Sequence, residues 1–132
     1  MERSYQYDIV VVGGGTAGVA AAVGAAKAGA KTLLVERNAY LGGEAANSGV
    51  NCFCGFYTCG SDPVRVVKGI GQLVLDEMRA LGPTIAEEIS ASGNRDIIFQ
   101  PEYLKCALDN LLEKEHVDYF LHTVLIGRDC GE

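Results

Sequence analysis

The chain has 132 residues, 48% of them hydrophobic, which fits one globular domain or part of a larger one and excludes an intrinsically disordered protein. Its formal net charge is −6 and it has no basic cluster, so nucleic acid is not an expected partner. The polar N-terminal residues MERSYQYD and the absence of a long, unbroken apolar stretch predict neither a secretory signal nor a membrane span. Together with five cysteines that show no disulfide-framework spacing, these features predict a cytoplasmic protein.

The first part of the chain predicts a β-strand, an α-helix and a second strand. The β-branched run at 9–12 indicates a strand buried on both faces of a parallel sheet. Residues 16–28 are rich in alanine and predict a helix that ends at Gly29. Residues 31–35 predict the second buried strand, which completes a βαβ unit of roughly 30 residues.

A glycine-rich turn with the pattern Gly13-x-Gly15-x-x-Gly18 joins the first strand to the first helix. In such a turn Gly13 permits the tight bend, Gly15 lets the backbone approach a pyrophosphate, and Gly18 lets the helix pack closely on the sheet. The free N–H groups near Thr16 and Ala17 are then expected to face phosphates.

An acidic residue, Glu36, follows the second predicted strand. An acid at this place accepts hydrogen bonds from a ribose diol, and its charge repels a 2′-phosphate, which disfavours NADP. The alternative is a glycine-rich turn that binds nothing. Because strand, glycine spacing, helix and acid occur together, we favour a dinucleotide-binding site.

The next part of the chain is less regular. Residues 38–60 are expected to form a long irregular segment. A helix is predicted over 62–81, with Asp62 as its N-cap and Pro63 at its first position. Residues 84–95 are weakly patterned, and 97–99 predict a short strand.

A last predicted helix begins at Pro101 and carries four leucines on one face: Leu104, Leu108, Leu111 and Leu112. Strand-like pieces follow at 117–121 and 124–126. The order strand, helix, strand, loop, helix, helix, strand is that of the first half of a doubly wound parallel sheet. The predicted fold class is therefore α/β, with the strands in spatial order 3-2-1.

Four segments resemble the N-terminal part of the FAD-dependent oxidoreductases, a family with a glutathione-reductase-like FAD-binding domain that includes relatives of the flavin subunit of heterodisulfide reductase. They read GGGTAGVAAAVGAAKAGAKTLLVERNAYLGGEAANSG, CGFY, VVKGIGQLVLDEMRALG and QPEYLKCALDNLLE. The similarity covers nearly the whole chain. It implies an incomplete Rossmann-like FAD-binding domain with FAD as cofactor.

The resemblance also implies positions around the cofactor. It places the following residues beside FAD: Glu36 and Arg37 at the adenosine ribose, Gly42 and Gly43 at the diphosphate, and a backbone group near Val124 against the adenine. Glu44 follows the double glycine, and its role stays open. His122 is interpreted as a polar residue at a strand end, with a place near the adenine as the alternative.

Members of this family are several times longer and continue with a substrate-side domain. We therefore interpret residues 1–132 as the N-terminal portion of an FAD-binding domain that lacks the substrate domain and is inactive alone. A small-molecule substrate is expected only in the intact protein. The strand at 9–12 would leave an open apolar edge, which favours a homo-oligomer or poor solubility.

The cysteines Cys52, Cys54 and Cys59 lie close together in the sequence. Their spacing matches neither a usual zinc site nor an iron–sulfur ligand run, so we expect no metal. We favour packing of small residues in a loop. Because the resemblance places this loop near the flavin ring, electron exchange between a thiol and the flavin is the alternative.

The sequence thus favours the FAD-binding part of an oxidoreductase that transfers hydride or electrons. Two alternatives stay open. An NAD-binding module would use the same glycines, although the double glycine at 42–43 disfavours it. A non-catalytic fragment would only associate with itself. Arg65 and Lys68 are interpreted as solvated charges on a helix face, with contact to an anionic substrate as the alternative.

Overall fold

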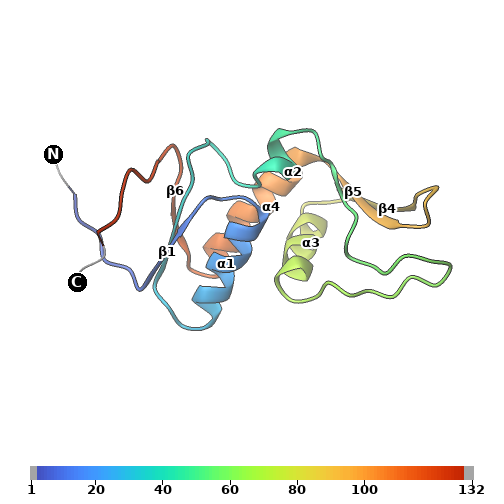
Figure 1. Cartoon of the computed structure of the whole chain (residues 1–132), viewed down its shortest axis with the longest axis horizontal. Helices are drawn as coiled ribbons and strands as arrows, with labels where there is room; N and C mark the ends of the chain where they lie inside the picture. The colour runs from blue at the N-terminus through green and yellow to red at the C-terminus, as the bar shows by residue number, and fades with distance from the viewer. Residues whose placement is uncertain (1–2, 130–132) are drawn as a thin grey trace.

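Residues 3–129 are described by a computed structural model in which helices lie between two small sheets (Figure 1). The first sheet is parallel and contains β1 (Ile9–Val12), β2 (Thr32–Val35) and β6 (Asp118–Phe120) in the order β1-β2-β6. Helix α1 (Thr16–Lys27) connects β1 to β2. The predicted α/β class, the βαβ unit and the strand order 3-2-1 are therefore confirmed.

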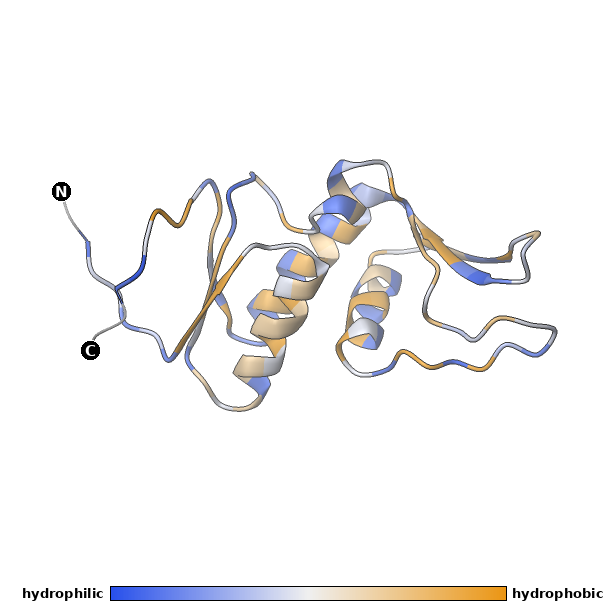
Figure 2. Ribbon diagram, viewed as in Figure 1, coloured by the Kyte–Doolittle hydropathy of each residue, from blue (hydrophilic) through white to orange (hydrophobic). Residues whose placement is uncertain are grey.

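The two first strands differ in burial. In β2 the side chains of Thr32, Leu33 and Leu34 are all buried, as predicted. In β1, by contrast, Ile9, Val10 and Val12 are 41%, 52% and 54% exposed. The expectation that 9–12 is buried on both faces is wrong, because β1 pairs only with β2 within residues 3–129. Figure 2 shows the apolar character of this strand.

The second sheet is antiparallel, with β3 (Cys52–Phe53), β5 (Arg95–Phe99) and β4 (Ile85–Ile89) in the order β3-β5-β4. The sequence predicted only the strand at 97–99 and missed the hairpin that precedes it. β4 is largely exposed, and its sequence, IAEEI, has no clear alternation of apolar and polar residues that would predict a strand. The turn between β4 and β5 is marked in the sequence by a glycine, Gly93. This residue adopts φ +80° and donates its N–H to Ser90 O at 2.9 Å.

The remaining helices are α2 (Glu44–Asn47), α3 (Ile70–Ala80) and α4 (Pro101–Lys114). The predicted start of a helix at Asp62 is wrong. Gly69, at φ +66° and ψ −127°, precedes α3 in a conformation that no helix contains, so residues 62–69 stay irregular. The strand expected at 124–126 does not form either, whereas α4 begins at Pro101 as predicted.

The core lies where α1, α3 and α4 pack on one another, and Leu34 of β2 belongs to the same cluster. The four leucines of α4 are each 2% exposed or less, which confirms the predicted apolar face. They pack in one cluster with Val19 and Val23 of α1 and Met78 of α3. At the periphery Lys114 Nζ lies 2.6 Å from Glu77 Oε1 and links α4 to α3. Within residues 3–129, no helix has both the length and the apolar character that crossing a bilayer requires.

Two glycines of α1 give a matched test of the packing. A Cβ at Gly18 would lie 1.8 Å from Gly13 O, whereas one at Gly24 would lie 3.6 Å from Ile70 Cδ1, an ordinary contact. We expect Gly18→Ala to lower the melting temperature strongly. Gly24→Ala should raise stability slightly, by about 0.5–1 kcal/mol, because alanine is the better helix former. Thermal denaturation followed by circular dichroism checks both, and equal stability of the two variants would contradict the packing described.

The open edge of β1 predicts self-association, because an unpaired apolar strand is a template for pairing with another chain. We expect the chain to elute as a dimer or larger species in size-exclusion chromatography with light scattering. Val10→Lys places a charge on this edge, where the valine is 52% exposed, and should shift the protein toward monomer. A monodisperse monomer of the unmodified chain would contradict the prediction.

Candidate functional site

Two glycine turns touch one another, one that joins β1 to α1 and one in the segment that follows β2. Gly42 donates its N–H to Gly14 O at 2.8 Å, and Gly15 and Gly42 form a parallel bridge. A Cβ at Gly43 would lie only 2.9 Å from the Cα of Gly15. A side chain at Gly43 would therefore push the turns apart, whereas a Cβ at Gly42 would lie 2.7 Å from the Cβ of Ala46.

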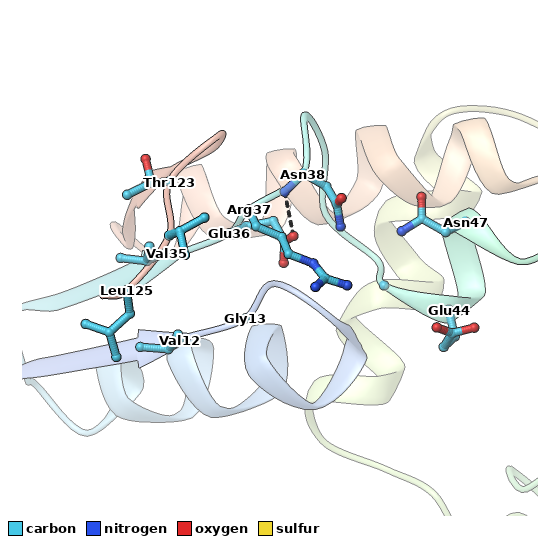
Figure 3. Close-up of a pocket in the computed structure, with 12 residues that line it drawn as sticks. Val12, Gly13, Val35, Glu36, Arg37, Asn38, Glu44, Asn47, Thr123 and Leu125 are labelled. Atoms are coloured by element: carbon cyan, nitrogen blue, oxygen red, sulfur yellow. Dashed lines mark hydrogen bonds between the residues drawn. The ribbon is translucent and has the colours of Figure 1, made fainter. Parts of the chain in front are cut away.

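The carboxylate of Glu36 lies beside these turns and is only 5% exposed. Its Oε2 accepts the N–H of Gly14 at 2.5 Å, and its Oε1 accepts the N–H of Asn38 at 2.7 Å, the bond dashed in Figure 3. Each carboxylate oxygen has two acceptor sites. One site on each oxygen is thus used by the backbone, and one remains for a ligand.

Helix α1 begins at the same place without a capping side chain. Gly15 is its N-cap, with φ −68° and ψ 178°, and the first turn has no acidic residue. The first N–H groups of a helix have no partner inside the helix and carry partial positive charge. Thr16 and Ala17 are exposed here, so this helix end is open to an anion. A Cβ at Gly18 would lie 1.8 Å from Gly13 O, so there is no room for a side chain where α1 approaches the turn.

A cleft of about 460 Å³ opens over these elements (Figure 3). It brings together six of the residues predicted from the sequence: Gly13, Glu36, Arg37, Gly43, Glu44 and Val124. Gly15, Gly42 and the first turn of α1 support it from below and do not line it. The structure therefore places most of the predicted cofactor-binding residues around one space.

Sequence reasoning missed the other residues that line the cleft: Val12, Val35, Asn38, Asn47, Thr123 and Leu125. Asn47 could have been found from the sequence, because it lies three residues after Glu44 and residues three apart share a helix face. Thr123 had none. It reaches the cleft because its N–H donates to Glu36 O at 2.9 Å, a contact between distant parts of the chain.

The segment after β6 forms one wall of the cleft. His122 donates its backbone N–H to Asn38 O at 3.1 Å and adopts φ +51°. Its side chain is exposed and does not line the cleft. The bonds of His122 and Thr123 carry the chain across the end of β2, which puts Val124 and Leu125 at the cleft.

None of the three clustered cysteines lines the cleft. Cys54 and Cys59 are exposed and Cys52 is half-buried, so the packing interpretation is wrong for the first two. Cys59 Sγ donates to Asn94 Oδ1 at 2.8 Å. Within residues 3–129, no three His, Cys, Asp or Glu side chains are grouped in a way that would hold a metal ion.

Arg65 and Lys68 also lie outside the cleft. The expected exposed helix face is absent at Arg65, because this residue is part of the irregular segment before α3 and is half-buried. Its Nε donates to Val67 O at 3.0 Å, and its guanidinium lies 5.6 Å from the centre of the Phe56 ring. Lys68 is exposed, which agrees with a solvated charge.

Two curated proteins show the similarity of the chain at sequence level. Thiamine thiazole synthase of Aeropyrum pernix is 33% identical over 103 residues, which cover 69% of this chain and 34% of the synthase. Digeranylgeranylglycerophospholipid reductase of Thermoplasma acidophilum is 32% identical over 123 residues, which cover 87% of this chain and 26% of the reductase. The chain thus spans about a third or less of the length of these relatives.

Solved structures show the same fold. Glycine oxidase of Bacillus cereus superposes with a TM-score of 0.57 at 14% identity. The superposition covers 96% of this chain and 49% of the oxidase chain. A 3-ketosteroid-Δ4-(5α)-dehydrogenase of Rhodococcus jostii superposes with a TM-score of 0.55 at 23% identity. This superposition covers 92% of this chain and 38% of the dehydrogenase chain. At these identities the likeness shows the fold alone.

A family model gives the assignment directly. The model described as FAD dependent oxidoreductase matches residues 8–131. The match includes both glycine turns, Glu36 and the segment that ends at the cleft. Because it covers nearly the whole chain, this chain belongs to the family of FAD-dependent oxidoreductases.

Proposed function

We propose that the cleft binds FAD and that residues 1–132 form the N-terminal, cofactor-binding portion of a flavin-dependent oxidoreductase. One observation carries the proposal. The buried carboxylate of Glu36 lies at the end of β2 with an acceptor site free on each oxygen, directly beside a glycine turn and an uncapped helix N-terminus. Ribose hydroxyls and a diphosphate need these two features next to each other.

The adenosine end is assigned to the side of the cleft where β2 and the segment after β6 meet. Glu36 would accept hydrogen bonds from the ribose hydroxyls. Val12, Val124 and Leu125 offer apolar surface to the adenine ring, and Val124 is 65% exposed, which leaves its side chain free for that contact. Burying this surface under the adenine would favour binding.

The diphosphate is assigned to the two glycine turns. The absence of Cβ atoms at Gly15 and Gly43 leaves the backbone accessible, and the N-terminus of α1 offers N–H donors. The guanidinium of Arg37 lies at the same cleft and supplies positive charge in a chain of net charge −6. The negative charge of Glu44 would repel the phosphates. Its carboxylate, however, already accepts a hydrogen bond from the hydroxyl of Ser48 and lies in the first turn of α2.

When bound, FAD supplies hydride or electron transfer, and the residues of this chain bind and orient it. The groups that contact substrate are assigned to a further domain, because the matched relatives are about three times as long or longer. We infer a small organic substrate, acted on in the cytoplasm by the intact protein. Kinship with the flavin subunit of heterodisulfide reductase rests on the sequence resemblance and stays a hypothesis.

Absorbance tests the cofactor. We expect the purified chain, mixed with FAD and passed through a desalting column, to retain the yellow flavin spectrum. NAD, titrated in parallel by fluorescence, should bind weakly or not at all. A protein that stays colourless but binds NAD would favour the NAD-binding module, and one that binds neither would favour a fragment that only associates with itself.

Glu36→Gln tests the ribose contact against a matched control. The substitution removes the charge and turns one acceptor into a donor that faces a backbone N–H, so FAD affinity should fall on the order of tenfold to a hundredfold. Glu44→Gln removes the same charge at the rim of the cleft and should leave affinity equal or higher. Melting temperatures of both variants separate loss of binding from loss of folding. Equal losses of affinity in two folded variants would contradict the assignment of Glu36.

Gly43→Ala tests the contact between the two turns. The residue adopts φ +52° and ψ −131°, and its Cβ would approach Gly15 Cα to 2.9 Å, so the substitution should abolish flavin retention. Gly55→Ala is the control, because no atom lies within 4 Å of a Cβ there. Flavin retention by a folded Gly43→Ala protein would contradict the assignment of the diphosphate to the two glycine turns.

A further inference from the structure

Two thiols lie side by side on the second sheet, remote from the chemistry assigned to the cleft. Cys52 is in β3 and Cys54 follows its end, so the two side chains lie on the same side of an extended segment. Phe53, between them, points the other way. Its ring centre lies 4.4 Å from that of Phe99 and 5.6 Å from that of Phe56, and it packs against the core.

The same alternation separates the thiols from α1. Phe53 lines an apolar cavity of about 300 Å³ together with Thr16, the first residue of α1. The cysteines lie on the opposite side of the strand, where Cys54 is exposed and Cys52 half-buried. Direct electron exchange with a flavin bound at α1 is therefore disfavoured, whereas small reagents in solution can reach the pair.

The separation of the sulfurs suits a disulfide. Cys52 Sγ and Cys54 Sγ lie 3.5 Å apart. A disulfide requires about 2.05 Å, and the Cα atoms of residues two apart in a strand are separated by about 6.6 Å, near the upper end of the range that disulfides span. Closing the bond requires a contraction of the extended segment, because the Cβ atoms of a disulfide lie about 3.5–4.5 Å apart. The backbone can supply it, because β3 ends at Phe53 and Gly55 follows with open space around it.

The other described cysteines are placed differently. Cys59 is engaged with Asn94 across the hairpin of the second sheet, and Cys106 is exposed on α4. Within residues 3–129, Cys52 and Cys54 are the one pair of sulfur atoms in contact. The geometry thus distinguishes this pair from the rest of the cluster that the sequence presents.

We propose that Cys52 and Cys54 form a reversible disulfide by exchange with a low-molecular-weight disulfide of the glutathione type. One protein thiolate attacks a sulfur of the oxidised reagent and releases one reduced thiol, which leaves a mixed disulfide. The second protein thiolate then attacks the protein sulfur of that mixed bond and releases the other thiol. The protein loses two electrons and two protons, and one oxidised reagent becomes two reduced thiols. This proposal does not depend on FAD binding.

Two properties of the bond follow. A disulfide closed across a single residue of an extended segment is strained and exposed, and such bonds are readily reduced again.

The exchange is also slow at neutral pH. The hydrogen bond with Cys52, partial desolvation and the nearby Asp96 of β5 raise the pKa of the Cys54 thiol to about 11, and only the thiolate is nucleophilic. The rate should therefore increase with pH.

Mass spectrometry tests the proposal on the full chain. The reduced protein is equilibrated without oxygen in mixtures of reduced and oxidised glutathione, quenched with acid, alkylated and digested with trypsin, which leaves the peptide 38–65 intact between Arg37 and Arg65. Tandem mass spectrometry of this peptide distinguishes the pair from Cys59, because fragments that end between residues 54 and 59 separate them. We expect the peptide that contains Cys52 and Cys54 to lose two hydrogens and to escape alkylation at both cysteines, while Cys59 and Cys106 stay alkylated. Added dithiothreitol should restore alkylation of the pair.

Two exposed positions provide matched variants. Cys59→Ser should leave the bond unchanged, and Cys54→Ser should abolish it and leave Cys52 as a mixed disulfide with glutathione. Circular dichroism shows whether both variants fold. The proposal is overturned if the cysteines of the pair carry separate glutathione adducts under all conditions, if Cys59 enters the bond, or if the pair stays fully alkylated while Cys106 is oxidised.

Discussion

The buried carboxylate of Glu36 is the contact on which the arrangement of the site depends. Its two oxygens accept N–H groups from Gly14 and Asn38, and its own backbone bonds to Phe120 and Thr123. A buried charge is unfavourable unless hydrogen bonds compensate it. Here the compensating donors come from the turn before α1 and the chain after β2. The charge therefore fixes the glycine turn against the strand ends before any ligand arrives.

Much of this arrangement could be predicted where the signal was local. The glycine spacing, the strand 32–35 and the leucine face of α4 each follow from residues close in sequence. The start of α3 could not be predicted from Asp62 and Pro63, which suit a helix start, because the conformation of Gly69 decides it. The exposure of β1 also escaped prediction. An apolar run indicates a strand but does not tell how many neighbours that strand has in this chain.

The residues missed at the cleft share a different reason. Asn38 and Thr123 contribute through backbone bonds that form only when distant segments meet, and neither residue type marks a binding site by itself. The cysteines show the converse case. Their clustering in the sequence drew attention to all three, yet strand alternation and the bond of Cys59 to Asn94 separate them into a pair and a single thiol. The three cysteines are therefore close in sequence but do not form one site.

The order in which the chain emerges during synthesis gives β6 a particular meaning. The first turn, α1 and β2 are complete within the first 36 residues, but the wall of the cleft that carries Val124 requires β6 to pair with β2. The bond from Tyr7 to Asp118, which also joins β6 to the start of the chain, spans 111 residues. Contacts of such long range carry a large loop-closure entropy and form late in folding. The phosphate end of the site can thus form early, while its adenine end is completed only after Leu125 has been made.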